Sequence, residues 1–283
     1  MQLVTVRIDG ATQAGRVVGE GDDREVVLLD APDVRAVLEA GPVTSGEVGV
    51  AEQGSGALPL RDADLAPLIP APDKIVCVGL NYRDHAAETD SALPAAPIYF
   101  AKYRRALTGP YDPVVLPAPD VSTKADWEVE LAVVIGRPVR NARADEALDA
   151  IAGFTVLNDV SVRDWQFRTS QFLAGKTFEK STPLGPTLVT TDEIGDGTGL
   201  EVSCSIDGVT KQSSNTDQLI FSPAELVADL STIMTLDPGD VIATGTPAGV
   251  GQARDPQEWL APGMVMRTTI EGIGSTENRC IIA

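Results

Sequence analysis

The chain has 283 residues, which suggests about two domains and enough buried surface to fold without a disulfide or a structural metal. Hydrophobic residues make up 43% and charged residues 22%, as in ordinary globular proteins. The formal net charge of −19 repels nucleic acid and anionic membranes, so we expect neither as a partner.

The first 70 residues are predicted to form a small α+β domain. Short β-like runs occupy residues 3–8, 15–18 and 25–29, and a short helix is expected at 34–40. Residues 41–56, rich in Gly, Ser and Glu, are predicted to be an exposed loop. Pro70-Ala71-Pro72-Asp73 then interrupts the chain before a buried-looking strand at 74–79. We therefore divide the chain into domains at 1–70 and 71–283.

The second domain is predicted to be rich in strands and poor in helices. Apolar runs at 131–135, 153–157 and 241–244 are typical of buried strands, and residues 200–206 followed by Asp207-Gly208 indicate a hairpin. Helices are expected at 144–152 and, after the capping sequence Ser222-Pro223-Ala224-Glu225, at 226–234. Strands and helices do not alternate regularly, which disfavours a doubly wound fold and favours an α+β domain built on a rolled, largely antiparallel sheet.

The cysteines and the chain ends indicate a cytoplasmic protein. Cys77, Cys204 and Cys280 are isolated, as reduced thiols are in a cytosol, and no apolar stretch reaches the ~18 residues that a spanning helix needs. The start has no basic region followed by an apolar run, so we expect no signal peptide. The last four residues match a prenylation motif, but an apolar terminal strand is the favoured interpretation.

Three carboxylates are candidates for a metal site. In a strand, Glu128 and Glu130 point to the same face, and Asp159 follows another apolar run. No lysine or arginine lies within the first strand to offset their repulsion, and a hard cation with oxygen ligands would do so. The alternative is a solvated strand face, and this local pattern leaves both open.

The only histidine has an acidic neighbour at helical spacing. His85 and Glu88, three residues apart, would lie on one face of a helix within hydrogen-bond reach. A carboxylate there would orient the imidazole and raise its basicity, as a general base requires. The alternative is a surface histidine with a charge partner.

The sequence does not match other catalytic or nucleotide-binding motifs. Gly175-Lys176-Thr177 lacks the first glycine of a phosphate loop, and the glycine-rich residues 245–251 lack dinucleotide spacing. One histidine cannot make a zincin motif, and no Gly-x-Ser-x-Gly surrounds a plausible nucleophile.

Taken together, the motifs over residues 70–275 resemble those of the fumarylacetoacetate hydrolase family. They are Gly79-Leu80-Asn81-Tyr82 with His85 and Glu88, Asp126-Trp127-Glu128-Val129-Glu130, Asn158-Asp159-Val160-Ser161-Val162-Arg163-Asp164-Trp165-Gln166, Gly175-Lys176-Thr177-Phe178, Pro183-Leu184-Gly185-Pro186, Leu236-Asp237-Pro238-Gly239-Asp240 and Thr244-Gly245-Thr246-Pro247-Ala248-Gly249-Val250-Gly251. The resemblance implies the family's C-terminal-type fold, a rolled, mixed, largely antiparallel β-sheet (a β-sandwich roll) with few helices.

The resemblance also implies roles for the candidate residues. Glu128, Glu130 and Asp159 would bind Mg²⁺ or Mn²⁺, and His85 with Glu88 would activate water on a lid that substrate orders. The remaining positions, expected to line the pocket and hold a small 2-oxo acid, with Lys176 also assisting catalysis, are Tyr82, Arg163, Gln166, Lys176 and Thr246. A homodimer is implied as well.

Two departures from the family pattern narrow the subgroup. Asn81 stands where fumarylacetoacetate hydrolase proper has an acidic metal ligand, so the chain resembles a three-carboxylate subgroup of acylpyruvate hydrolases and oxaloacetate decarboxylases. Gly263-Met264 replaces a common Gly-Asp pair. Residues 89–96 and 167–172 are expected to shape specificity.

The reaction that this resemblance favours is hydrolysis of a C–C bond in a 2,4-dioxo acid. The metal, with Lys176 and Arg163, would stabilise the developing enolate, and His85 would take a proton from the attacking water. The alternatives are decarboxylation of oxaloacetate, isomerisation of a 2-hydroxyhepta-2,4-diene-1,7-dioate type, and a relative that binds a 2-oxo acid without turnover.

Overall fold

A large mixed sheet forms the frame of the chain. The structure, a computed structural model, describes residues 1–44 and 46–282. Within them an 11-stranded sheet runs in the order β4 (Glu52–Pro59), β3 (Glu25–Leu29), β2 (Ala11–Val18), β1 (Gln2–Ile8), β13 (Thr182–Thr190), β11 (Ile151–Asn158), β10 (Val129–Ile135), β16 (Val241–Ala243), β5 (Ile75–Gly79) and β6 (Ile98–Ala101), with β7 (Leu107–Thr108) beside β13.

A second sheet packs against the middle of the first. Its strands run in the order β15 (Val209–Asn215), β14 (Glu201–Ile206), β17 (Val265–Ile270), β18 (Gly274–Ile282) and β8 (Val114–Leu116). One hydrophobic cluster holds Leu131 and Val133 of β10 together with Cys204 of β14 and Met266 of β17. The two sheets therefore share a core, as expected of a rolled sandwich.

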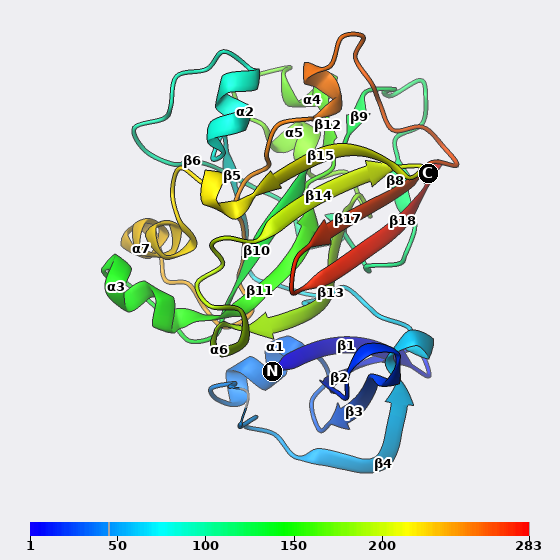
Figure 1. The fold of residues 1–283 in the computed structure, drawn as a ribbon, viewed down its shortest axis with the longest axis vertical. Helices are drawn as coiled ribbons and strands as arrows, with labels where there is room; N and C mark the ends of the chain where they lie inside the picture. Colours follow the sequence, from blue (N-terminus) through cyan, green and yellow to red (C-terminus); the bar gives the residue numbers. More distant parts are fainter. Residues whose placement is uncertain (45, 283) are drawn as a thin grey trace.

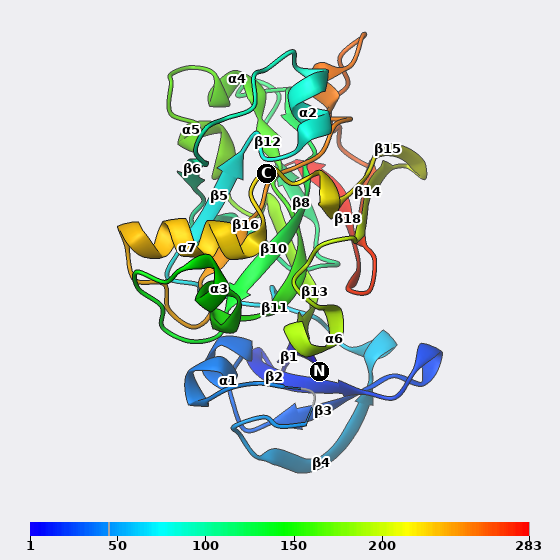
Figure 2. The same ribbon diagram turned by 60° about the vertical axis from the view of Figure 1, so that its left-hand side comes forward.

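Helices are short, and the longest that the structure describes has 11 residues. They are α1 (Val34–Ala40), α2 (Arg83–Glu88), α3 (Ala144–Ala147), α4 (Arg163–Gln166), α5 (Leu173–Lys176), α6 (Thr191–Ile194) and α7 (Pro223–Ile233), and a two-stranded ribbon joins β9 (Ala125–Asp126) to β12 (Ser161–Val162). Figures 1 and 2 agree that α2, α4 and α5 gather at one end of the molecule, whereas β1 to β4 of the large sheet lie with α1 at the opposite end. No helix in the described residues is long and apolar enough to cross a membrane.

The observed architecture confirms the predicted fold class. Most strand pairs are antiparallel, while β5 with β16, β7 with β13 and β8 with β18 are parallel. The helix at 34–40 is found as α1, and Ser222 caps α7 through a reciprocal capping box with Glu225. The terminal apolar run is part of β18, beside β8, as far as Ile282.

Two predicted elements are wrong. The loop expected at 41–56 gives way to β4 from Glu52 onward, because backbone hydrogen bonding to β3 outweighs the weak β propensity of Gly and Ser. Residue 45 of that loop lies outside the described residues. The helix expected at 144–152 ends at Ala147 and continues as a 3₁₀ turn, because Ile151 and Ala152 are buried in the sheet as the start of β11.

The first 70 residues share a core with the rest of the chain. A single hydrophobic cluster contains Leu3, Leu29 and Val37 together with Val134 and Leu184. In addition, β1 pairs with β13, so the large sheet is continuous across residue 70. The division of the chain at residue 70 stays a prediction.

Candidate active site

A cavity of about 540 Å³ opens at the end of the large sheet where α2, α4 and α5 gather. Its walls come from the ends of β5 and β6, from the residues that start β10, and from the loop after β16. The parallel pair β5 and β16 carries its two C-terminal ends to the same edge of the sheet, which brings Gly79 and Thr246 into one pocket.

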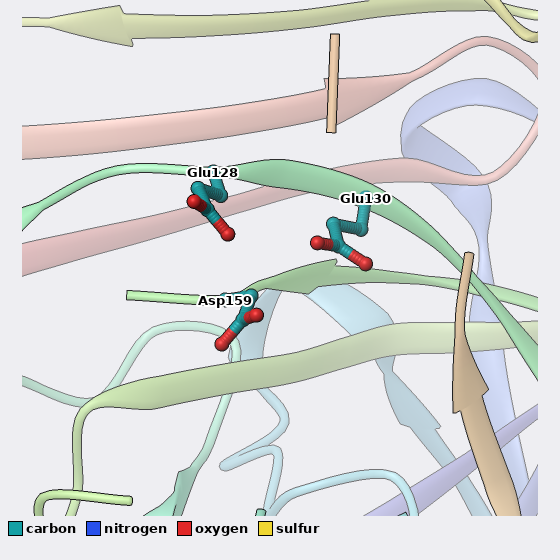
Figure 3. A group of neighbouring side chains, drawn as sticks. All are labelled: Glu128, Glu130 and Asp159. Atoms are coloured by element: carbon teal, nitrogen blue, oxygen red, sulfur yellow. The ribbon is translucent and has the colours of Figure 1, made fainter. Parts of the chain in front are cut away.

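The three predicted carboxylates meet at the inner end of this cavity. Glu128 immediately precedes β10, Glu130 lies on it, and Asp159 immediately follows the neighbouring β11. The Asp159 amide donates to the Glu128 carbonyl at 2.9 Å, which holds the two segments in register. One oxygen of each carboxylate lies within 4.8 Å of the others, all three residues are buried, and Figure 3 shows the side chains converging.

Three cations, none of them in the strand itself, surround the carboxylates. The Lys176 ammonium donates to Glu128 Oε2 at 2.5 Å and to Asp159 Oδ2 at 2.8 Å. Arg163 Nη1 lies 2.7 Å from Glu128 Oε1. Lys102 Nζ, fully buried, lies 2.6 Å from Asp159 Oδ1. The prediction that a metal is the simplest remedy for the acidic repulsion was therefore incomplete, because distant segments also supply positive charge.

The three carboxylates differ in how far nearby cations offset their negative charge. Burial alone would raise the pKa of Glu128, but Lys176 and Arg163 lower it to about 2. Burial raises the pKa of Glu130 well above its usual range, and repulsion from Asp159 and Glu128 raises it further. Glu130 accepts a hydrogen bond from the Gly245 amide at 2.8 Å but forms no ion pair with any residue that the structure describes. It is the carboxylate that lacks a cation.

Asp126 has a role that the sequence did not reveal. It is fully buried, and its Oδ2 accepts from Arg163 Nε at 2.8 Å while Oδ1 accepts from the Gly251 amide at 2.7 Å. The amide of Gln252 also donates to Oδ2, at 3.0 Å. Asp126 thus ties the Arg163 guanidinium and the loop after β16 to the strand that carries the carboxylates.

His85 and Glu88 form the predicted contact on α2. His85 Nδ1 lies 3.0 Å from Glu88 Oε2, and because a carboxylate can only accept, Nδ1 carries the proton, so Nε2 is the acceptor in the neutral imidazole. Glu88 Oε1 accepts from the Gly249 amide at 2.8 Å, and Asp84 accepts from Ser214 at 2.5 Å. These contacts hold the helix against its neighbours. Ordering of this segment by substrate stays a prediction.

The structure brings most of the predicted residues together. Those that line the cavity are His85, Glu88, Glu128, Glu130, Arg163, Gln166, Lys176 and Thr246. Asp159 lies behind them, fully buried. Tyr82 does not line the cavity as predicted. It is packed in the hydrophobic core, and its hydroxyl has no hydrogen-bond partner among the residues that the structure describes.

The two departures from the family pattern also have structural explanations. The Asn81 amide donates to the carbonyls of Thr244 and Phe221 at 2.7 and 3.0 Å, and its oxygen accepts from the Phe221 amide. Asn81 therefore serves the backbone of the neighbouring loops. Met264 follows a turn before β17 and packs beside the core, and it is not among the residues that line the cavity.

The donor set fits a hard divalent cation. Three converging carboxylate oxygens are the ligands that such an ion prefers, and Glu130 still lacks a positive partner. Counting Asp126, Glu128, Glu130 and Asp159 against Lys102, Arg163 and Lys176, the buried cluster has four carboxylates and three cations. A dication would make it positive, as the capture of an anionic substrate by a chain of charge −19 requires.

The chain is similar to known proteins over most of its length. Residues 74–281 match the family described as Fumarylacetoacetate (FAA) hydrolase C-terminal. The chain is 44% identical over 245 residues to "Oxaloacetate tautomerase Fahd2a, mitochondrial" of Rattus norvegicus, a match that covers 81% of this chain and 78% of the relative.

Solved structures with the same fold include two with different reaction names. The 2-hydroxyhepta-2,4-diene-1,7-dioate isomerase from Mycobacterium marinum is 32% identical, with a TM-score of 0.82 over 100% of this chain and 98% of the other. A fumarylacetoacetate hydrolase from Exiguobacterium antarcticum is 30% identical, with a TM-score of 0.84 over 100% of both chains. The chain belongs to the fumarylacetoacetate hydrolase family.

Proposed function

We propose that this protein catalyses a divalent-metal-dependent keto–enol tautomerisation of a small 2-oxo acid, with oxaloacetate as the first substrate to test. The observation that carries the proposal is a single cavity lined by buried carboxylates, by Lys176 and Arg163, and by a histidine that Glu88 orients. Relatives named as tautomerases and isomerases support an isomerisation over the hydrolysis that the sequence favoured.

Glu128, Glu130 and Asp159 would hold the metal, which we propose is Mg²⁺ or Mn²⁺. When bound, such an ion stabilises negative charge on an enolate oxygen. Lys176 and Arg163 are the cations nearest the cavity and would hold the substrate carboxylate, with Gln166 and Thr246 donating or accepting hydrogen bonds beside them.

His85 would move the proton. With Nδ1 hydrogen-bonded to Glu88, its Nε2 can take a proton from C3 of the keto acid. The enolate oxygen then receives a proton from solvent, and the imidazolium returns its own proton to solvent. The reverse sequence returns the keto form. The reaction breaks one C–H bond, forms one O–H bond and needs no co-reactant.

The test is an ultraviolet assay of enol and keto oxaloacetate with Mg²⁺, with Mn²⁺, and with EDTA. We expect faster equilibration in the presence of either metal and none above the spontaneous rate with EDTA. Restoration by added Mg²⁺ is the control for damage by the chelator. Tautomerisation that EDTA leaves unchanged would contradict the metal-dependent mechanism.

Hydrolysis of a 2,4-dioxo acid is the second candidate. The imidazole of His85 has 15% of its surface exposed at the cavity, where the same Nε2 could take a proton from water. Chromatography of the products separates the candidates, because hydrolysis yields two acids, decarboxylation of oxaloacetate yields pyruvate and CO₂, and tautomerisation leaves the carbon skeleton intact. Binding of oxalate without turnover of any of these compounds would indicate a binding protein.

The homodimer and the cytoplasmic location remain predictions. Sedimentation at several protein concentrations would test the first, and imaging of a tagged full chain would test the second. The relative from Rattus norvegicus is named as mitochondrial, which makes the second test worthwhile.

A further inference from the structure

The cavity has a second, apolar half that the proposed reaction does not use. The apolar side chains of its lining are Val78, Leu80, Ile98, Phe100, Phe167, Phe172 and Val250. Ile98 keeps 42% and Phe167 54% of its surface exposed. Exposed apolar side chains that line a cavity are typical of a ligand site.

Aromatic rings form the centre of this wall. The Phe172 ring meets Phe100 edge to face, with centroids 5.7 Å apart, and meets Phe167 at 6.2 Å. Gly79 lies beside them, since a Cβ built there would contact Ile98 and Phe172 at 3.6 Å. The wall therefore continues across β5 and β6 to the segment before α5, as an aromatic surface open to the cavity.

Positive charge is confined to the inner half. Among the residues that line the cavity, the only lysine or arginine side chains are those of Arg163 and Lys176, and both contact Glu128. Lys176 Nζ also lies 4.8 Å from the centroid of Phe100, so this ring marks the border between the two halves. A carboxylate placed against the aromatic rings would meet no lysine or arginine of the cavity wall.

We propose that the preferred substrates are 2-oxo acids with one carboxylate and an aromatic or branched apolar group on C3 or C4. This inference rests on the proposed function, since it assumes that the 2-oxo acid head binds at the carboxylate end. The apolar group packs on Phe172 and its neighbours. Aryl-substituted pyruvates, whose enols are conjugated with the ring, are the simplest members of this class.

The cavity volume supports a substrate longer than oxaloacetate. A volume of about 540 Å³ is in the range of sites for drug-sized ligands. A four-carbon diacid keeps both carboxylates near the inner cations and leaves the aromatic wall uncovered. A longer diacid, such as a heptadiene dioate, would place its second carboxylate against that wall, so we expect the chain to disfavour it.

The test uses ligands that bind without reacting. Oxamate presents the 2-oxo acid head alone, N-phenyloxamate adds a phenyl group, and N-oxalylglycine adds a second carboxylate. Calorimetry on the Mg²⁺-loaded protein should find that N-phenyloxamate binds about tenfold more tightly than oxamate, whereas N-oxalylglycine gains nothing. Phe172→Ala should bring the ratio of N-phenyloxamate to oxamate affinity close to one.

Phe178→Ala is the matched control, because Phe178 packs edge-on against Trp165, with centroids 5.5 Å apart, and does not line the cavity. This variant should keep the wild-type ratio. N-oxalylglycine binding more tightly than N-phenyloxamate to the wild type would overturn the inference, and so would a ratio that Phe172→Ala leaves unchanged.

These outcomes are separable from failure of the proposed function. If N-phenyloxamate shows its advantage but oxaloacetate is not tautomerised, the substrate class holds and the reaction is wrong. If oxaloacetate is tautomerised and the phenyl group gives no advantage, the reaction stands and the substrate class is wrong. The affinities of the wild-type protein for the three ligands test the proposed substrate class even if Phe172→Ala does not fold.

Discussion

The parallel strands β5 and β16 carry a charged cluster at each end, and the two clusters differ in kind. Before the strands begin, Lys74 donates to Asp237 and Asp240, at 2.8 Å in each case. Asp240 also accepts from the amides of Lys74 and Asp237. Beyond the other end lie the buried carboxylates of the cavity, where Glu130 has no ion pair with a described residue.

The difference separates a structural cluster from a functional one. Around Lys74, the carboxylates accept hydrogen bonds from the Lys74 ammonium, and Asp240 also accepts from two backbone amides. The Lys74 side chain keeps 26% of its surface exposed. Around Glu130 burial is complete, this carboxylate has no ion pair with a described residue, and a cavity is adjacent. Buried charge that is left uncompensated beside a cavity is a stronger sign of ligand binding than the number of ion pairs.

The largest expected effect comes from neutralising the unpaired carboxylate. Glu130→Gln should lower tautomerase activity by at least about 100-fold and abolish metal binding measured by calorimetry, because it removes one of three ligands. The metal-free protein should be at least as stable as the wild type to urea, because the substitution removes a buried carboxylate that lacks a cation.

Asp237→Asn at the opposite cluster is the matched acid-to-amide control, and it should leave activity and metal affinity within about twofold, since an exposed pair contributes little. Metal binding retained by Glu130→Gln would contradict the assignment of this residue as a ligand.

An effect confined to turnover, with metal binding intact, is expected from His85, because the cluster around Lys74 has no histidine. His85→Ala should lower the rate by about 10² to 10⁴ if Nε2 moves the proton, while metal affinity stays near wild type. Steady-state kinetics paired with calorimetry checks this. A variant with an unchanged rate would remove His85 from the mechanism and weaken the contrast between the two ends.

The two lysines should differ in their contribution to stability. Lys102→Met leaves Asp159 with one cation fewer in a fully buried site and should cost about 3 kcal/mol of unfolding free energy. Lys74→Met breaks partly exposed pairs and should cost about 1 kcal/mol. Urea denaturation measures both, and equal costs would show that burial does not distinguish the clusters.

The smallest effect concerns the thiols. Burial raises the pKa of Cys204 to about 12 and also raises that of Cys77, which lies on β5 between the two clusters. A thiolate is the reactive form, so a disulfide reagent should label neither at pH 8 over minutes, while urea should expose both. Rapid labelling of the native protein would show that the sheet opens there.

Local residue patterns were sufficient to predict the elements of the site but not its charge balance. Glu128 and Glu130 have the spacing of one strand face, and His85 and Glu88 that of one helix face, and both pairs are found as predicted. Lys102 could not be assigned, because its contact with Asp159 joins residues 57 positions apart, and nothing in its own segment indicates a carboxylate partner.

The errors in the fold have the same origin. The segment 52–59 has weak strand propensity and becomes β4 because β3 supplies a partner edge, and Ile151 leaves a helical pattern because a buried sheet position is available. Of the aromatic wall, only Phe167 and Phe172 lie in a segment predicted to shape specificity, whereas Ile98 and Phe100 lie outside both predicted segments. The rings of Phe100 and Phe172 meet through tertiary packing between β6 and the segment before α5.

The core that Leu3 and Val37 share with Val134 and Leu184 has a consequence for how the molecule can be altered. Because these side chains occupy one cluster, the free energy that keeps the active-site strands folded is supplied in part by residues 1–70. Melting of the two parts should be a single cooperative event. Exchanging the first 70 residues for those of a relative would therefore require the partner side chains on β10 and β13 to be redesigned with them.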